Sequence, residues 1–257
     1  QLTRQSTSDR IQEDLEQLLQ TPGAFDYGFE GLEGISVLAP ESKAFRIFTW
    51  QLYVDQDHYQ YKGIIQTKAG KIYRLKDGSD AMRTVEFSTY RHKDWYGALY
   101  YNLHAFKHEG QTCYLLFGYD AYSFYQRRKV LDVLYFDEKG DPRFGKAVLE
   151  MKDGRGQLRT VKRMLLEYSA SVNVSLIYSV EEDWVKYDHL IYGSPIPGGG
   201  PSSVPDGSYC GLKYNARTGT WQYIDKLYKD DPNNVLIAAT RYGPFFTSGF
   251  RLCTRCG

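Results

Sequence analysis

A chain of 257 residues is long enough for one large β domain or for two small ones. Its 42% hydrophobic and 25% charged residues are ordinary for a folded globular protein, which argues against disorder of the whole chain. The 32 basic and 31 acidic residues balance each other, so we expect no nucleic-acid partner, and no apolar run reaches the roughly 20 residues of a membrane-spanning helix.

The first predicted element is a helix over residues 8–20. Ser8 or Asp9 can cap its N-terminus, because a short side-chain oxygen accepts a free amide of the first turn. Pro22 and Gly23 end it. Its apolar side chains fall on one face at helical spacing: Ile11, Leu15, Leu18 and Leu19. A single amphipathic helix before a sheet is expected to dock on that sheet, and binding of a partner is the alternative.

Alternating apolar and polar residues then predict strands almost without interruption. Turn residues favour hairpins at 55–57, 108–111, 138–141 and 215–219, and the polar stretch 79–94 predicts a loop or a short irregular strand. The predicted strands are 35–39, 45–53, 58–67, 71–75, 98–107, 112–120, 129–137, 143–151, 161–169, 173–180, 184–192, 208–214 and 220–227. The sequence thus predicts an all-β fold, an antiparallel meander of about a dozen strands with one N-terminal amphipathic helix.

The predicted strands fall into three clusters, which resemble propeller blades, although a closed barrel or two packed sheets would suit the same alternation. We expect residues 1–24 to form the N-terminal helix and its connector, and residues 25–229 to form a single all-β domain. Within that domain the Gly- and Pro-rich segment 195–203 predicts a long mobile loop. Residues 230–257 form a C-terminal tail that either supplies a last strand or hangs loose.

Cysteine spacing predicts no metal or redox site. Four cysteines allow three complete pairings, and sequence alone selects none of them. They are Cys113, Cys210, Cys253 and Cys256. Cys253 and Cys256 have the separation of half a zinc knuckle or of a redox pair. The other half of a knuckle is missing, and redox pairs of this type begin a helix after a strand. We therefore expect no metal centre and no cofactor.

Carboxylates at strand ends are candidates for glycan hydrolysis, which needs two carboxyl groups about 5 to 10 Å apart across a sugar. Asp55 and Asp57 lie on a predicted hairpin tip beside His58, and Asp94 ends the polar stretch. Aspartate is also common in turns, because its side chain accepts hydrogen bonds from nearby amides. We therefore predict turn roles for these residues and keep a glycan hydrolase as the alternative function.

Histidines give a weaker signal for a metal site. His92, His104 and His108 lie close in sequence, with Asp94 and Glu109 near them. A metal site needs three ligands that converge and neighbours that orient them. His104 and His108 share a strand face only if the strand is regular. No nucleophile elbow, phosphate-binding loop or dinucleotide motif occurs either, so catalytic residues are unknown at this level.

Aromatic residues are the strongest remaining signal, with 23 Tyr, 13 Phe and 4 Trp. Exposed rings beside hydrogen-bonding groups give contact area at low entropic cost, which suits binding of carbohydrate or peptide. The ordinary alternative is that tyrosine favours half-buried strands. The candidate contact rim for a ligand comprises Trp50, Tyr53, Tyr59, Tyr61 and Trp95.

The predicted strand 98–107 has two different faces if it is regular. One face carries Leu99, Tyr101, Leu103 and Ala105. The other carries Tyr100, Asn102, His104 and Phe106. We expect one face to enter the core and the other to form a mixed aromatic and polar surface.

Several short segments resemble an uncharacterised group of exported, β-rich bacterial proteins. They are Trp184-Val185-Lys186-Tyr187-Asp188-His189-Leu190, Val204-Pro205-Asp206-Gly207-Ser208-Tyr209, Gly219-Thr220-Trp221, Pro22-Gly23-Ala24-Phe25, and Phe48-Thr49-Trp50-Gln51 to Gly63-Ile64-Ile65-Gln66. The correspondence is spread over most of residues 10 to 227. The resemblance implies an antiparallel fold and a location outside the cytoplasm, in the periplasm, at the cell surface or secreted. It brings no catalytic residues, and the tail with Cys253 and Cys256 lies outside it.

Together these observations favour a non-enzymatic binding or structural protein of the bacterial envelope, with carbohydrate or an envelope protein as its partner. The first alternative is the glycan-acting hydrolase described above. The second is a helix-mediated assembly protein, which would use Ile11, Leu15 and Leu18 of the predicted helix.

Overall fold

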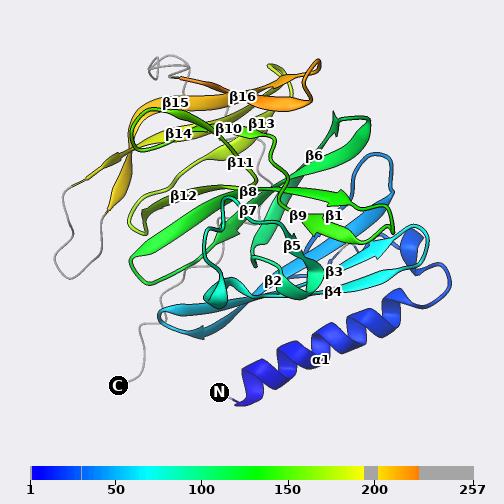
Figure 1. Ribbon diagram of the computed structural model, residues 1–257. Helices are drawn as coiled ribbons and strands as arrows, with labels where there is room; N and C mark the ends of the chain where they lie inside the picture. Colours follow the sequence, from blue (N-terminus) through cyan, green and yellow to red (C-terminus); the bar gives the residue numbers. More distant parts are fainter. Residues whose placement is uncertain (1, 30, 194–201, 226–257) are drawn as a thin grey trace, which may run out of the picture.

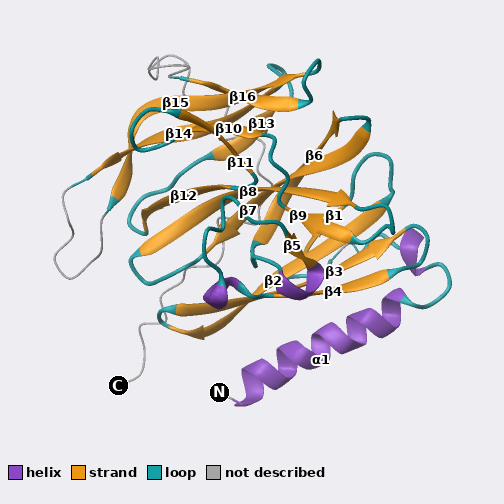
Figure 2. Cartoon of the chain, viewed as in Figure 1, coloured by secondary structure: helices purple, strands orange, loops and turns teal. Residues whose placement is uncertain are grey.

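The computed structural model describes residues 2–29, 31–193 and 202–225. Three β-sheets are stacked in layers, and one long helix covers the outer face of the first sheet (Figure 1). Coloured by secondary structure, the described chain is mostly strand (Figure 2), which confirms the predicted all-β class. The sheets lie face to face and do not close into a barrel or radiate as blades, so the packed-sheet alternative holds, with three sheets in place of two. Among the described residues, no helix is both long and apolar enough to span a membrane.

The first sheet contains β1 (Ser36–Leu38), β2 (Phe45–Asp55), β3 (His58–Thr67) and β4 (Ile72–Lys76). These strands follow one another in chain order and pair antiparallel throughout, which confirms the predicted hairpin of β2 and β3. In β2, β3 and β4, odd-numbered residues such as Phe45 and Ile65 face the middle sheet. Even-numbered residues such as Phe48 and Ile64 face the helix, so both faces of this sheet are covered.

The middle sheet contains β5 (Tyr90–Arg91), β6 (Leu99–His108), β7 (Gln111–Asp120), β8 (Gln126–Phe136), β9 (Pro142–Phe144) and β12 (Met164–Ser169). Their order is β5-β9-β8-β7-β6, and β12 pairs with the first half of β8 while β9 pairs with its end. This sheet is buried on both faces, so β7 reads as a continuous apolar run. Leu115 and Phe117 face the third sheet, and Tyr114 and Leu116 face the first.

The third sheet contains β10 (Leu149–Lys152), β11 (Leu158–Val161), β13 (Leu176–Ser179), β14 (Trp184–Tyr192), β15 (Ser203–Asn215) and β16 (Thr220–Ile224). Their order is β11-β10-β16-β15-β14-β13. Pairing is antiparallel except between β10 and β16, which run parallel where Leu149 lies beside Trp221. Most of the predicted loop 195–203 and all of the predicted tail 230–257 lie outside the described residues.

Two predicted strands are divided between sheets. The prediction for 143–151 is wrong, because β9 belongs to the middle sheet and β10 to the third. Gly145 lies at the break with φ +93°, and a Cβ there would lie 2.7 Å from the Ser88 carbonyl oxygen, so any other residue would be strained. The prediction for 161–169 is wrong in the same way, because Val161 ends β11 whereas Met164 begins β12.

The predicted faces of strand 98–107 are wrong beyond Tyr100. The pairing of β6 with β7 shifts register between Tyr100 and Asn102, so one extra residue is accommodated there as in a β-bulge. Tyr100 and Leu103 therefore both pack in the core toward the first sheet. Tyr101 and Phe106 both pack in the core toward the third sheet. The aromatic residues that we expected on the surface of this strand, Tyr100 and Phe106, are therefore buried in two different cores.

The helix α1 (Leu2–Leu19) starts earlier than predicted and presents a different face to the sheet. Its buried side chains recur every three or four positions: Ser8, Gln12, Leu15 and Leu19. Gln12 Nε2 donates a hydrogen bond to the Gly63 carbonyl oxygen at 3.2 Å. Ile11 and Leu18, which we expected on the buried face, are 43% and 49% exposed. The helix therefore contacts the sheet partly through the polar side chain of Gln12, where we expected apolar side chains alone.

Arg46 on β2 fastens the chain that follows α1, where the short helical turn η1 (Ala24–Asp26) lies. Its Nη1 donates to the Tyr27 carbonyl oxygen at 2.5 Å and its Nη2 to the Ala24 carbonyl oxygen at 2.6 Å. Nη2 also donates to Gln66 Oε1, and Gln66 Nε2 donates to the Leu19 carbonyl oxygen at 2.8 Å. The end of the helix is therefore held to the first sheet through buried carbonyl groups.

Candidate functional site

The predicted contact rim does not form one exposed surface. Trp50, Tyr61 and Trp95 are buried, with exposed fractions of 5%, 3% and 0%. Tyr53 is 44% exposed, and Tyr59 beside it is half-buried. Only these two of the five predicted residues are therefore placed to contact a ligand directly. Their binding of a ligand is still a prediction.

The burial of the other three follows from contacts between distant parts of the chain. Trp50 lies under α1, with its Nε1 3.4 Å from Ser8 Oγ. Trp95 Nε1 donates to Tyr100 Oη at 2.9 Å inside the core between the first and middle sheets. Tyr61 lies in the same core. The stacking of the layers, which strand alternation does not encode, makes these rings structural.

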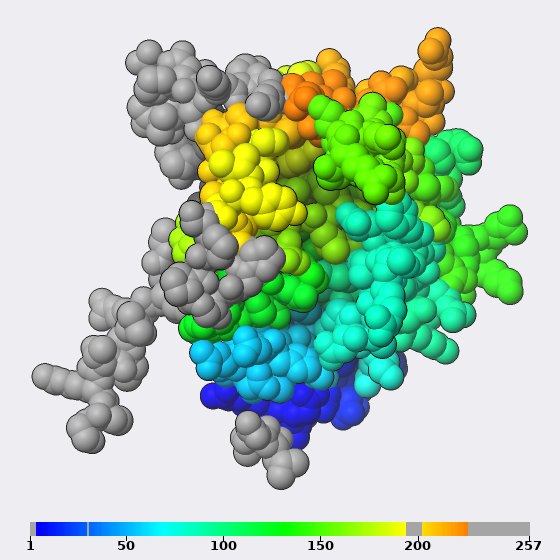
Figure 3. Space-filling model, turned by 60° about the vertical axis from the view of Figure 1, so that its left-hand side comes forward, coloured from blue at the N-terminus to red at the C-terminus, as the bar shows by residue number. Residues whose placement is uncertain are grey.

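Exposed rings instead gather where the β2–β3 hairpin meets the β7–β8 connection. Tyr53 and Tyr59 pack edge-on with ring centroids 5.5 Å apart. On the β7–β8 connection, Tyr122, Phe124 and Tyr125 are 41%, 45% and 42% exposed. We call these five residues the aromatic patch. In Figure 3, which brings this end of the molecule forward, the light-blue tip of the hairpin lies below the green β7–β8 region.

Hydrogen bonds hold the two connections together. Asp57 Oδ1 accepts from the Phe124 backbone amide at 3.1 Å, across 67 positions of sequence. Asp55 Oδ1 accepts from the Asp57 amide at 3.0 Å and shapes the hairpin tip. Arg127 Nη1 donates to the carbonyl oxygens of Ala121 and Gln126, each at 3.0 Å. The backbone under the patch is therefore fixed from both sides.

A buried carboxylate anchors the β7–β8 connection from below. Asp120 accepts hydrogen bonds from Tyr61 Oη at 3.2 Å, from Tyr96 Oη at 2.8 Å and from the Tyr122 amide at 2.9 Å. Burial raises the pKa of Asp120, although these donors act in the opposite direction. The Arg128 guanidinium lies 3.2 Å from the centre of the Tyr122 ring. Tyr122 is still 41% exposed despite its contacts with Asp120 and Arg128.

The β7–β8 half of the patch was missing from the prediction. Its signal is the run Tyr122-Ser123-Phe124-Tyr125, which contains three aromatic residues without strand alternation. Rings in a segment that is neither strand nor helix have no regular face to bury, so such a run favours exposed rings as much as the hairpin does. Its position beside Asp57 depends on a contact that no local pattern shows.

The carboxylates proposed for glycan hydrolysis have turn roles. Asp55 and Asp57 bind amides of the hairpin tip and of the patch, as described above. Asp94 Oδ1 accepts from the Arg91 amide at 2.6 Å within the short helical turn η3 (His92–Asp94). Asp94 lines a hollow that neither Asp55 nor Asp57 lines. Their predicted role in turns agrees with these bonds.

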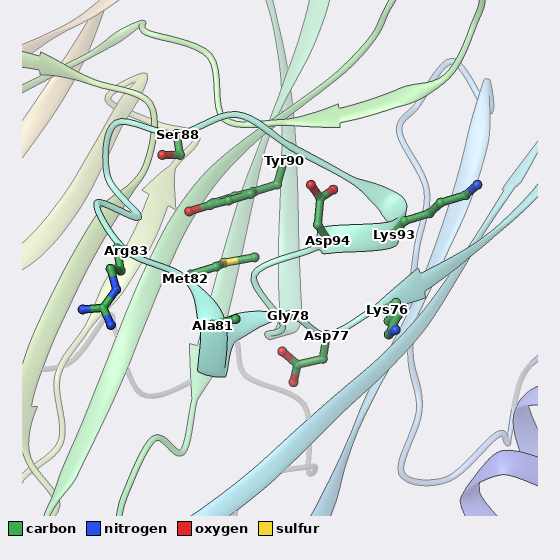
Figure 4. Close-up of a pocket in the computed structure, with 10 residues that line it drawn as sticks. All are labelled: Lys76, Asp77, Gly78, Ala81, Met82, Arg83, Ser88, Tyr90, Lys93 and Asp94. Carbon is green, nitrogen blue, oxygen red and sulfur yellow. The ribbon is translucent and has the colours of Figure 1, made fainter.

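Asp94 does line a hollow of about 410 Å³ with another carboxylate, Asp77 (Figure 4). Asp77 Oδ2 accepts from the Tyr61 amide at 2.8 Å, and Oδ1 accepts from both the amide and the hydroxyl of Ser79. Burial raises the pKa of Asp77 against these hydrogen bonds. Figure 4 shows the two carboxyl groups pointing in different directions. The pair therefore lacks the facing arrangement of glycosidase acids.

Comparison with known proteins adds no relative. No family model, no curated protein and no solved structure matches the chain. The resemblance to exported bacterial proteins is therefore still a prediction, and the function has to be argued from the residues of this chain.

The candidate metal ligands do not come together. Across residues 2–29, 31–193 and 202–225, no group of three His, Cys, Asp or Glu side chains is placed to hold an ion. His104 stacks on Tyr178 with ring centroids 3.7 Å apart, whereas His92 packs on Tyr73 in another layer. Cys113 and Cys210 are buried and unbridged within this part of the chain, and Cys253 and Cys256 lie outside it.

Proposed function

We propose that the protein is a non-catalytic binding protein that contacts carbohydrate through the aromatic patch. The observation that carries the proposal is the exposure of four rings, each between 41% and 45%, on a backbone fixed by Asp57 and Asp120. Rings held open to water in this way lose little conformational freedom when a ligand covers them.

Carbohydrate fits this patch better than an apolar protein surface does. A sugar ring presents apolar C–H groups on its faces and hydroxyl groups around its edge, so it needs flat rings with polar groups beside them. The patch provides both, because the Arg4 guanidinium lies 5.5 Å from the centre of the Tyr53 ring and the exposed residues Asp55 and Gln56 follow Tyr53 at the hairpin tip. No exposed large aliphatic side chain belongs to the hairpin tip or to the β7–β8 connection.

The proposal includes a location outside the cytoplasm, in the bacterial envelope or secreted. It rests on the sequence resemblance alone. Cell fractionation of the natural host with an antibody against the folded protein tests it, and recovery in the cytoplasmic fraction would contradict it.

A glycan array on the full chain, followed by calorimetric titration of the best glycan, tests the function. Replacing Phe124 by alanine is expected to weaken binding about five- to tenfold, because stacking contacts of one ring are worth about 1 kcal/mol. Tyr53→Ala is expected to act in the same direction. Both residues are exposed, so the fold is expected to persist, and circular dichroism checks this.

Tyr192→Ala is the matched control, because Tyr192 is 84% exposed and lies on β14 of the third sheet, whereas the connections of the patch belong to the first and middle sheets. It is expected to leave the titration unchanged. Equal loss of affinity in Tyr192→Ala and Phe124→Ala, or binding that survives both patch substitutions, would contradict the assignment of the surface. Capture of a protein with no glycan bound would favour a protein partner instead.

Helix-mediated assembly is a second candidate, because Ile11 and Leu18 are exposed on one side of α1. Leu15 does not belong to that surface, since it is buried against the first sheet. Deleting the helix would uncover Phe48 and Ile64, so a double substitution is cleaner. If the protein is oligomeric, Ile11→Gln with Leu18→Gln should convert it to a monomer in sedimentation experiments, with a circular dichroism spectrum like that of the wild type. Oligomers that persist in this variant would contradict the assembly role.

A further inference from the structure

The hollow of about 410 Å³ is a built feature of the loop between β4 and β6. The loop is closed at its base, because the Gly78 amide donates to the Trp95 carbonyl oxygen at 2.9 Å and the Trp95 amide donates to the Lys76 carbonyl oxygen at 3.0 Å. Between these ends lie the short helical turn η2 (Ser79–Ala81), β5 and η3. A volume of this size falls within the range of about 300 to 1,000 Å³ that is usual for small-molecule sites.

The wall of the hollow is apolar and fixed. Met82 and Tyr90 line it, and both also pack against the core between the first and middle sheets. Behind the Tyr90 ring, the fully buried Arg163 guanidinium lies 5.0 Å from the ring centre. This contact holds the ring in place before any ligand arrives. The hollow therefore offers a flat preformed surface to an apolar body.

The lining of the hollow carries a net positive charge, because three of its residues are basic and two are acidic. Lys76, Arg83 and Lys93 line it and form no ion pair with any described residue. Other groups fix the two acidic residues of the lining: Asp77 accepts three hydrogen bonds at its two oxygens, and Asp94 lies 3.9 Å from Arg91 Nε. Figure 4 shows Arg83 and Lys93 on opposite sides of the hollow, with the Lys93 side chain extending outward from it. Flexible cations at a rim attract an anion without being held to one geometry.

We propose that this hollow binds a small organic anion with a flat apolar body, such as an aromatic carboxylate. The body would lie against Met82 and Tyr90, and the acid group would lie at the rim, where Arg83 and Lys93 flank the hollow from two sides. This site is separate from the aromatic patch, because none of the five patch residues lines the hollow. It therefore does not depend on the function proposed above.

Benzoate and its uncharged analogue benzamide, titrated into the full chain and followed by ligand-detected NMR, test the proposal. Benzoate is expected to bind at least fivefold tighter than benzamide. Arg83→Gln with Lys93→Gln is expected to weaken benzoate at least fivefold and to leave benzamide unchanged. Both residues are exposed, so the fold should persist. Lys68→Gln with Arg217→Gln removes the same charge from exposed positions outside the hollow and should leave both ligands unchanged.

Three results would overturn the proposal. The first is no detectable binding of benzoate to the wild-type protein. The second is equal affinity for benzoate and benzamide, which would remove the role of charge. The third is an equal loss of benzoate affinity in the Arg83/Lys93 variant and in the Lys68/Arg217 control. Such a result would show that the net charge of the protein, and not the charge at the hollow, determines the affinity. None of these results bears on glycan binding by the aromatic patch.

Discussion

Replacing Arg163 by methionine is expected to lower the free energy of unfolding by about 3 to 5 kcal/mol, measured by urea denaturation at pH 7. Arg163 Nε lies 2.9 Å from Asp132 Oδ2, and both side chains are fully buried. Without the guanidinium, the Asp132 carboxylate would be left charged in the core between the first and middle sheets. A buried charge without a partner is among the most destabilising single changes.

The surroundings of the ion pair show why it is costly to break. Arg163 Nη1 also donates to the Val85 carbonyl oxygen at 2.8 Å, which ties the loop between β4 and β6 to the middle sheet. Tyr100 Oη lies 3.3 Å from Asp132 Oδ2 and is the carboxylate's second side-chain contact. Losing Arg163 therefore removes a charge partner and a loop anchor together.

Two variants separate the ion pair from general effects. Arg159→Met is the matched control, because Arg159 is about half exposed and pairs with Asp153 at 2.7 Å, so it should cost less than about 1 kcal/mol. Asp132→Leu combined with Arg163→Met should be more stable than Arg163→Met alone, because no buried charge is left. A loss of less than about 1 kcal/mol in Arg163→Met, equal to the control, would show that the carboxylate is not isolated by burial.

Raising the pH from 8 to 9.5 is expected to stabilise the wild-type protein relative to a Lys129→Met variant by about 1 to 2 kcal/mol. Burial of Lys129 on β8 lowers the pKa of its ammonium group to about 8, from about 10.5 in the unfolded chain, although Asp188 acts in the opposite direction. At pH 7 the group is charged in both states, so the fold carries the cost of burying it. Between the two pKa values the folded state has released the proton that the unfolded state still holds. Stability therefore rises with pH in this window.

Urea unfolding of both proteins at pH 7, 8 and 9.5 measures this effect. Lys129 Nζ lies 4.8 Å from the centre of the Tyr101 ring, and the Met variant loses this contact as well. The difference in unfolding free energy at one pH therefore includes this contact, whereas the change of that difference with pH reports the titration of Lys129. Lys213→Met is the control, because Lys213 is exposed and lies over the Trp184 ring at 5.1 Å. A difference between wild type and Lys129→Met that stays constant from pH 8 to 9.5 would contradict the depressed pKa.

Local pairings could be predicted from the sequence because their signals are local. The hairpins of β2 with β3, β6 with β7 and β15 with β16 each join adjacent alternating segments through a short turn. The parallel pairing of Leu149 with Trp221 joins residues far apart in sequence, and no local pattern in either segment predicts it. The stacking of three sheets is a sum of such distant contacts, so alternation left barrel, propeller and packed sheets equally open.

The candidate site was half predictable for the same reason. Tyr53 and Tyr59 face each other across a hairpin, which sequence spacing reveals. Trp50 was expected in the rim, but its exposure depends on where α1 docks, and the polar residue Gln12 helps to set that position. Phe124 was not expected, since only the hydrogen bond of its amide with Asp57 places it beside the hairpin.

The most direct test of the aromatic patch is an amide chemical-shift titration by NMR with the best glycan from the array. We expect the largest shifts at the amides of Asp57 and Phe124, which are linked through one hydrogen bond under the patch. Val180 and Tyr192, which are 83% and 84% exposed in the third-sheet region, should not shift. Shifts concentrated in the third sheet, with Asp57 and Phe124 unchanged, would contradict binding at the patch.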